Sequence, residues 1–253
     1  MTSTILVTGG TGRLGRLVVP LLADAGAKVR VLSRHVGELA AGIDHFAADL
    51  VRGQGIEPAL DGADVVLHLA GGPKGDDVAT ANVVRAAVHA GVRHLVYVSV
   101  VGADRVPLAW YRSKLGAERA VAGSGLAWTT LRAAQFHDLV LAVSEKLARL
   151  PVIPLPGGLR FEPVDARDVA QRIADLTLRE PAGVVADLAG PRVYPLAELV
   201  RGYLGAQGKR RLMLPIRMPG KAGRAYRAGE NLAGPHADRG TRTWENFLAE
   251  RRL

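Results

Sequence analysis

Three glycines near the start of the chain have the spacing of a phosphate-binding turn. Residues 8–15 read TGGTGRLG, follow the apolar residues 5–7 and precede the apolar run of residues 17–25. This order of strand, glycine turn and helix is typical of dinucleotide-binding folds, where glycine allows a sharp turn and close approach to a pyrophosphate. The anion then lies on backbone N–H groups at the positive end of the helix. The residues predicted to line the pyrophosphate are Gly9, Thr11, Gly12, Arg13, Leu14 and Gly15.

Side chains around this turn indicate which dinucleotide is preferred. NAD-dependent proteins usually place an acidic residue about 20 positions beyond the glycines, on the ribose 2′-hydroxyl, whereas an arginine accommodates the 2′-phosphate of NADP. Here the next expected strand ends at Ser33 and is followed by Arg34, and the first carboxylate after it is Glu38. Arg13 lies inside the glycine turn, so two guanidiniums could hold a 2′-phosphate through charge-assisted contacts. We therefore predict NADP(H) as the cofactor, with Ser33 and Arg34 among its ligands.

The rest of the chain alternates strands and helices that would position this turn. The expected strands are residues 28–33, 45–48, 64–70, 94–100, 127–131 and 184–188. The expected helices are residues 77–90, 108–122, 136–149, 166–178, 195–204 and 242–251, with a short helix within 34–42. Such alternation predicts an α/β fold with a Rossmann-type doubly wound parallel sheet, and it favours nucleotide binding over an ordinary turn without a ligand.

The length of the chain permits one large core. We expect a single NAD(P)-binding domain over residues 1–253, because α/β folds of this size are commonly one domain. The alternating core is expected in residues 1–135. The remaining part, residues 136–253, is richer in proline and glycine and is expected to form the substrate cleft over the carboxyl ends of the strands.

Positive charge is concentrated near the end of the chain. The formal net charge is +9, and residues 201–253 hold twelve lysines and arginines against four acidic residues. Nucleic acid is one acidic partner to consider, but the basic residues are interspersed with Gly, Pro and Ala and form no DNA-binding motif, so a solvated basic surface is favoured. With no cysteine, no leader sequence and no apolar run of about 18 residues, we expect a cytoplasmic protein without a membrane partner.

A metal site is not expected. His45, His68, His89 and His94 lack the spacing of metal ligands. His68 lies within the apolar run of residues 64–70, where a buried and hydrogen-bonded side chain is the simpler interpretation.

Six short motifs are distributed over most of the chain: TGGTGRLG at 8–15, ADL at 48–50, LAG at 69–71, VSVVGA at 98–103, YRSKLGAE at 111–118 and PVDARDVA at 163–170. Together they resemble the short-chain dehydrogenase/reductase superfamily, specifically its atypical, NmrA-like branch of NAD(P)H-binding proteins. The resemblance implies that Asp49 and Leu50 flank the adenine of the cofactor. It also implies that Leu69, Ala70 and Gly71 lie along the pyrophosphate and ribose.

The same resemblance implies a catalytic Tyr-x-x-x-Lys motif, in which tyrosine exchanges a proton with the substrate and lysine binds the nicotinamide ribose. Lys114 matches the lysine, but the residue four positions earlier is Trp110, whose indole can only donate a hydrogen bond. Tyr111 lies one helical step away and either swings into the site or has a structural role. Ser99 matches the assisting serine of the family in part, because two valines follow it.

His137 follows the last strand of the expected core and either donates a proton at the nicotinamide end of the site or lines its wall. The leading hypothesis is an NADP(H)-dependent oxidoreductase that transfers hydride to a carbonyl, quinone or other unsaturated group of a small hydrophobic substrate. Tyr111, water or the substrate would supply the proton. The alternative is a non-catalytic NmrA-like redox sensor; a nucleotide-sugar epimerase is disfavoured because it relies on the missing tyrosine. A second copy of the chain or a protein partner is left open.

Overall fold

The computed structural model describes residues 3–34, 42–72 and 74–251, and its chain forms two compact units. The short helix expected within residues 34–42 lies almost wholly outside the described residues. The first unit contains Met1–Ser99, Arg112–Leu131 and Ala170–Val185. The second unit contains Val100–Tyr111, Arg132–Val169 and Ala186–Leu253.

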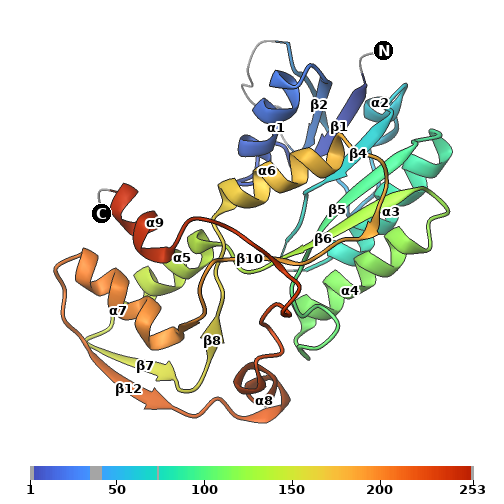
Figure 1. The fold of residues 1–253 in the computed structure, drawn as a ribbon. Helices are drawn as coiled ribbons and strands as arrows, with labels where there is room; N and C mark the ends of the chain where they lie inside the picture. The colour runs from blue at the N-terminus through green and yellow to red at the C-terminus, as the bar shows by residue number, and fades with distance from the viewer. Residues whose placement is uncertain (1–2, 35–41, 73, 252–253) are drawn as a thin grey trace. The chain divides into compact units, whose positions relative to one another are not determined.

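A parallel sheet forms the centre of the first unit (Figure 1). Its main strands are β1 (Thr4–Thr8), β2 (Lys28–Ser33), β3 (Asp44–Ala47), β4 (Val65–His68), β5 (His94–Val100) and β6 (Trp128–Ala133), and β9 (Gly183–Val184) pairs with β6. Their spatial order is β3-β2-β1-β4-β5-β6, and β1 pairs in parallel with both β2 and β4. This confirms the doubly wound Rossmann sheet. Ligands of such sheets bind at the carboxyl ends of the strands where the order reverses, here at β1 and β4.

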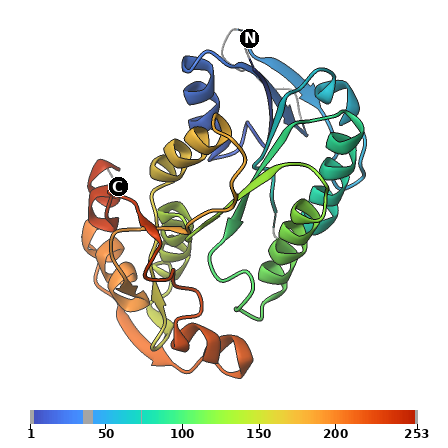
Figure 2. The same cartoon turned by 45° about the vertical axis from the view of Figure 1, so that its right-hand side comes forward.

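Helices cover both faces of this sheet (Figures 1 and 2). One face carries α1 (Gly15–Asp24) and α6 (Ala166–Thr177), and the other carries α2 (Glu57–Leu60), α3 (Asp76–His89) and α4 (Ala109–Ala122).

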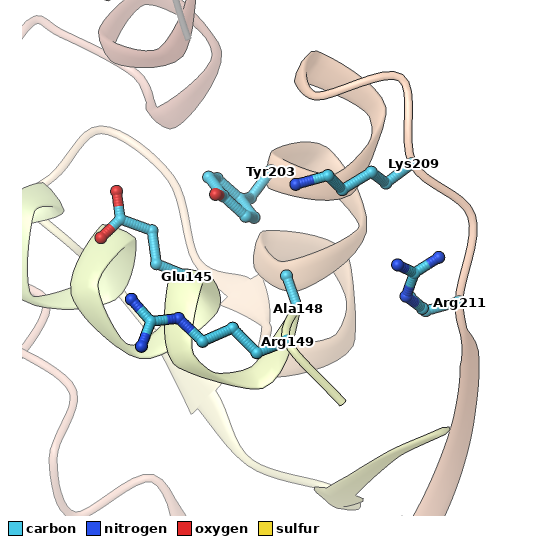
Figure 3. Close-up of a pocket in the computed structure, with 6 residues that line it drawn as sticks. All are labelled: Glu145, Ala148, Arg149, Tyr203, Lys209 and Arg211. Atoms are coloured by element: carbon cyan, nitrogen blue, oxygen red, sulfur yellow. The ribbon is translucent and has the colours of Figure 1, made fainter. Parts of the chain in front are cut away.

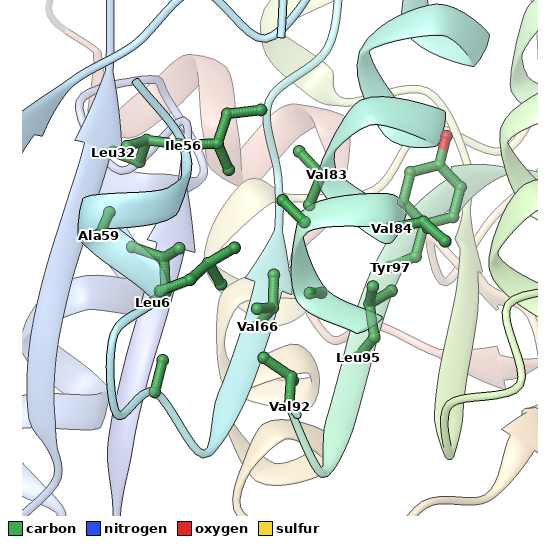
Figure 4. Close-up of a cluster of buried hydrophobic side chains, with 14 of the residues drawn as sticks. Leu6, Leu32, Ile56, Ala59, Val66, Val83, Val84, Val92, Leu95 and Tyr97 are labelled. Atoms are coloured by element: carbon green, nitrogen blue, oxygen red, sulfur yellow. The ribbon is translucent and has the colours of Figure 1, made fainter. Parts of the chain in front are cut away.

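The core on the second of these faces explains why the strands read as apolar runs (Figure 4). Leu6, Val66 and Leu95 come from three neighbouring strands and pack with Val83 of α3 and Val121 of α4. All five side chains are fully buried. Complete burial of a leucine or valine contributes about 1.5–3 kcal/mol each, so this face holds α3 and α4 firmly against the sheet.

The second unit is built from helices and short strand pairs. Its helices are α5 (His137–Leu147), α7 (Leu196–Ala206), α8 (Gly220–Ala228) and α9 (Trp244–Glu250). Its strand pairs are β7 (Val152–Pro156) with β12 (Leu212–Ile216), β8 (Arg160–Phe161) with β11 (Tyr194–Pro195), and β10 (Leu188–Ala189) with β13 (Asp238–Arg239). Tyr194, Trp244 and Phe247 are buried in its core, so this unit depends on large aromatic side chains.

Several expected elements differ from those observed. The strand expected at residues 184–188 is split into β9 and β10, which lie in different units. The strand β12 and the helix α8 were not expected, because Pro215 interrupts the apolar pattern of the strand and two glycines, Gly220 and Gly223, weaken the helical pattern. The expected helices at 136–149 and 242–251 are found, with slightly shorter bounds.

Candidate cofactor site and active site

The glycine turn between β1 and α1 has the geometry that close approach of a ligand requires. Gly9 has a left-handed φ of +69°, and a Cβ atom there would lie 2.8 Å from the Cα atom and backbone nitrogen of Ala70. A Cβ atom on Gly15 would overlap the Gly9 carbonyl oxygen. Gly12 is exposed, and a Cβ atom there would meet the same oxygen at 3.1 Å. Gly9 and Gly15 therefore close the turn, while Gly12 leaves its outer side open to a pyrophosphate.

Helix α1 begins at this turn without a side-chain cap. Its N-cap residue is Leu14, and the first turn of the helix contains no acidic residue. The Nε atom of Arg16 donates a hydrogen bond of 2.8 Å to the carbonyl oxygen of Thr11, which helps to fix the turn. The positive end of the helix is thus not neutralised by its own side chains, as an anion site requires. These residues fit the pyrophosphate of a dinucleotide.

A buried hydrogen-bond network joins the carboxyl ends of β1 and β4. The hydroxyl oxygen of Thr8 lies 2.6 Å from Nδ1 of His68, and Nε2 of His68 lies 3.0 Å from the hydroxyl oxygen of Thr80 on α3. Burial lowers the pKa of His68 to about 3, so the ring is neutral at pH 7. The backbone N–H of Ala70 donates to the same Thr8 oxygen at 3.2 Å. His68 is therefore the buried, hydrogen-bonded side chain expected from the sequence, and the network also positions the segment after β4.

Lys114 is held at the carboxyl ends of β4 and β5 by a buried ion pair. Its Nζ atom lies 2.7 Å from Oδ2 of Asp76, 3.5 Å from the carbonyl oxygen of Val98 and 5.2 Å from the centre of the Tyr97 ring. The exposed fractions of the lysine and aspartate side chains are only 11% and 3%. A Cβ atom on Gly71 would lie 3.3 Å from Nζ. The structure therefore places the ammonium beside the segment predicted to follow the cofactor.

Asp76 is a functional candidate that the sequence analysis missed. Its Oδ1 atom also accepts a hydrogen bond of 2.7 Å from the backbone N–H of Gly72, so one carboxylate holds both the lysine and the segment after β4. The available signal was an acidic residue in the first turn of α3. That position is already explained by the helix dipole, so the sequence alone gave no reason to select Asp76.

The arginines predicted to recognise a 2′-phosphate lie at the ends of neighbouring strands. Arg13 is in the glycine turn after β1, Arg34 directly follows β2, and both side chains are exposed. The hydroxyl oxygen of Ser33 lies 2.7 Å from Nε2 of His45, so this serine is engaged within the sheet. The positions of the two arginines are compatible with the predicted role, which stays a prediction.

Asp49 and Leu50 lie in a tightly held turn after β3. Oδ1 of Asp49 accepts backbone hydrogen bonds from Val51 at 3.0 Å and from Arg52 at 3.1 Å. The side-chain amide of Asn82 on α3 donates to the carbonyl oxygen of Leu50 at 2.8 Å. The contact of these two residues with adenine stays a prediction, and the observed bonds show that the turn is positioned from two sides.

Tyr111 lies in the second unit, where its hydroxyl group is already engaged. Nε2 of Gln135 donates a hydrogen bond of 2.9 Å to it, and the hydroxyl oxygen of Tyr226 lies 3.1 Å away. Its ring packs edge-on against the rings of Trp110 and Tyr226. Burial raises the pKa of Tyr111 above its ordinary value, so the phenol stays protonated. Of the two roles left open for Tyr111, these contacts favour the structural one.

Ser99 has a different environment. It lies in β5, next to the residue whose carbonyl oxygen contacts Lys114, and is 4% exposed. Within the described part of the chain its hydroxyl oxygen has no hydrogen-bond partner. A buried polar group without a partner costs about 1–3 kcal/mol, a cost that a hydrogen bond to a bound ligand would remove.

His137 is completely buried in the second unit. The centre of its ring lies 5.1 Å from that of Phe247 and 5.8 Å from that of Trp244, and its Nδ1 lies 3.8 Å from Oδ2 of Asp165, beyond hydrogen-bond distance. As the first residue of α5, it is turned into the aromatic core of its unit. This burial argues against both predicted roles, because a proton donor and a wall residue must each reach the substrate.

The chain also matches known proteins. Residues 9–178 match a family model described as NAD(P)H-binding, and this segment contains the glycine turn, Asp76 and Lys114. The chain belongs to the NAD(P)H-binding family. The expected membership of a family of NAD(P)H-binding proteins is thereby confirmed.

Curated relatives of this NAD(P)H-binding protein include two that are named as reductases. A (4-alkanoyl-5-oxo-2,5-dihydrofuran-3-yl)methyl phosphate reductase of Streptomyces griseus is 33% identical over 203 residues, which cover 77% of this chain and 70% of the relative. An NAD(P)H azoreductase of Xenophilus azovorans is 29% identical, covering 81% of this chain and 74% of the relative. The fold matches that of an NADPH-dependent quinone oxidoreductase of Escherichia coli in complex with NADPH, with a TM-score of 0.79, 22% identity and coverage of 97% and 99%.

Residues 3–34, 42–72 and 74–251 contain neither a cluster of metal ligands nor a membrane-spanning helix. No group of three or more His, Cys, Asp and Glu side chains is placed to hold a metal ion. No helix in these ranges has the length and apolar character needed to cross a membrane.

Proposed function

We propose that this protein is an NADPH-dependent reductase that acts on a carbonyl, quinone or other unsaturated group of a small hydrophobic molecule. The observation that carries the proposal is the Lys114–Asp76 ion pair beside Gly71, on the same sheet edge as the glycine turn. A lysine at this position suits a nicotinamide ribose, whose hydroxyl oxygens accept hydrogen bonds from an ammonium. The reductase names of the curated relatives support the same class of reaction.

The chain's own residues would divide the binding of the cofactor among them. The glycine turn and the start of α1 would hold the pyrophosphate, and Arg13 and Arg34 would favour NADPH over NADH. Lys114 and Ser99 would orient the nicotinamide end. The bound cofactor supplies the hydride, and the protein supplies positioning, exclusion of water and electrostatics.

The proton that accompanies the hydride is proposed to come from water or from the substrate. Trp110 cannot supply it, and the hydroxyl group of Tyr111 is engaged with Gln135 and Tyr226. Reduction of a quinone yields a weakly basic oxygen, which does not need a dedicated acid in the protein. That residues 136–253 form the substrate cleft stays a prediction.

The alternative is a non-catalytic sensor of the NADPH to NADP balance. It is favoured by Trp110 at the position of the catalytic tyrosine and by the buried, apolar Val100 and Val101 after Ser99. Such a protein would bind the cofactor at the same residues but would lack turnover.

One titration tests both functions. NADPH and NADH binding are measured by fluorescence, and then quinones, azo dyes, ketones and aldehydes are added while the nicotinamide absorbance is followed. We expect tight NADPH binding and turnover of at least one acceptor class, with the Tyr111→Phe variant retaining activity within about threefold. A wild type that binds NADPH but oxidises it with no acceptor would support the sensor. A thousandfold loss of reductase activity in Tyr111→Phe would show that this tyrosine donates the proton to the substrate.

A further inference from the structure

The second unit contains a hollow of about 470 Å³ that is lined mainly by charged side chains. It lies at the carboxyl end of α5, beside α7 and the segment leading into β12 (Figure 3). The lining residues are Glu145, Ala148, Arg149, Tyr203, Lys209 and Arg211. All of them belong to the second unit, and none is among the residues assigned to the cofactor.

Positive charge predominates in this hollow. Arg149, Lys209 and Arg211 are exposed cations, whereas Glu145 is the single acidic residue of the lining. Among the residues that the structure describes, none of the three cations forms an ion pair within 4 Å, and Nη1 of Arg211 donates to the backbone carbonyl of Arg210. Three cations against one carboxylate create a local positive potential that attracts anions.

Other arginines of the same unit are paired with carboxylates. Arg167 lies 2.8 Å from Asp165, and Arg239 lies 2.8 Å from Glu162, with both carboxylates buried. Those arginines therefore serve the fold of the unit. The cations of the hollow have no such structural task, so their convergence calls for another explanation.

Tyr203 adds a hydrogen-bond donor to the hollow. Its side chain comes from α7 and is only 6% exposed, so its position is fixed by the surrounding core. Burial, followed by the charge of Glu145, raises the pKa of Tyr203, so its phenol is protonated at neutral pH. In Figure 3 the ring lies between Glu145 and Lys209. A phenol O–H can donate a hydrogen bond to an anionic group, beside the charge-assisted hydrogen bonds that the cations can donate.

We propose that this hollow binds the phosphate group of a small phosphorylated organic molecule. A phosphate monoester carries close to two negative charges at pH 7 and offers three acceptor oxygens. It therefore suits three cations opposed by one carboxylate, with a phenol as a further donor, better than a singly charged anion does. The volume exceeds that of phosphate alone and lies in the range of small-molecule pockets, so it leaves room for an organic part. The proposal does not depend on the reductase function.

The test is a calorimetric titration of the full chain with phenyl phosphate at low salt, in the presence and absence of NADPH. We expect one phenyl phosphate per chain, with an affinity that falls as NaCl is raised, and no binding of benzyl alcohol. In the Arg149→Gln, Arg211→Gln double variant, affinity should fall about tenfold or more. The matched control is Arg210→Gln, which removes an exposed cation outside the lining and should leave affinity unchanged.

A second double variant separates this hollow from the cofactor site. Arg13→Gln with Arg34→Gln should weaken NADPH binding and leave phenyl phosphate binding intact. The proposal is overturned if phenyl phosphate binding is lost in that variant, if it survives unchanged in Arg149→Gln, Arg211→Gln, or if it is equally reduced by Arg210→Gln. Circular dichroism of each variant establishes that a lost signal does not reflect unfolding.

Discussion

Polar groups are organised differently in two parts of the molecule. One part lies at the carboxyl ends of β1, β4 and β5, and the other surrounds Tyr111. Around Lys114 and the glycine turn, buried side chains bond to backbone groups and so fix the surface to which a dinucleotide would bind. Around Tyr111, Gln135 and Tyr226, the polar groups bond to one another among aromatic rings. Cofactor binding therefore has a preformed framework, whereas a side-chain acid does not.

The largest effect is expected from Gly9→Ala. The left-handed φ of +69° and the 2.8 Å overlap with the backbone of Ala70 should together destabilise the fold by about 4 kcal/mol and abolish NADPH binding. The control is Gly26→Ala, where φ is +85° but no atom lies within 4 Å of the added Cβ. It should cost about 1 kcal/mol and preserve binding. Urea unfolding and fluorescence titration measure both; equal losses would show that strain alone, and not close approach, explains the glycine.

Asp76→Asn is expected to have the next largest effect. It leaves the buried ammonium of Lys114 without its counter-ion and should lower the free energy of unfolding by about 3 kcal/mol. Asp77→Asn is the matched control, because that carboxylate is exposed and bonds to the hydroxyl of Ser113, and its loss should cost under about 1 kcal/mol. In a cycle with Lys114→Met, the double variant should be more stable than the sum of the single losses predicts. Additive losses would mean that the two side chains are not coupled.

Arg34→Asp should weaken NADPH binding about 100-fold, because a charge-assisted contact of about 1.5–3 kcal/mol is replaced by repulsion. NADH lacks the 2′-phosphate and should lose far less affinity. Arg201→Asp makes the same charge change on the exposed surface of α7 and should alter neither value. Equal loss of NADPH and NADH affinity would remove the assignment of the 2′-phosphate to Arg34.

A smaller effect on the free energy of unfolding is expected from a change of pH. The pKa of His68 falls from its ordinary 6.5 to about 3 in the folded protein, so the unfolded chain binds a proton there that the folded protein does not. Stability from this group is therefore fully present above pH 6.5 and is lost as pH falls towards 3, by about 2 kcal/mol between pH 6.5 and pH 5. Urea unfolding should show that His68→Gln reduces this slope. The exposed His89→Gln should keep it, and a slope that is identical in both variants would contradict the assignment.

The sequence predicted the binding framework better than the catalytic environment, for a physical reason. Glycine spacing and apolar runs encode local backbone geometry, so the sheet and the turn could be derived from residues 8–15 and the strands that follow. The partners of Tyr111, Lys114 and His137 depend on contacts between residues far apart in the chain. Periodicity could not show that Tyr111 contacts Gln135 or that Lys114 pairs with Asp76. It also could not show that His137, expected at a substrate surface, lies among aromatic rings such as that of Phe247.

The composition of the first unit also sets the order in which the chain can fold during synthesis. Its hydrophobic core includes Ala117 and Val121 of α4, and its sheet continues with β6 and β9, all of which are synthesised after residue 99. A nascent chain of 99 residues therefore has an uncovered apolar face on Val83 and Leu95, which is the kind of surface that aggregates or recruits chaperones. The first unit can complete its fold on the ribosome only after about residue 185 has been synthesised. By then the segment from α5 to β8, which belongs to the second unit, has also been synthesised.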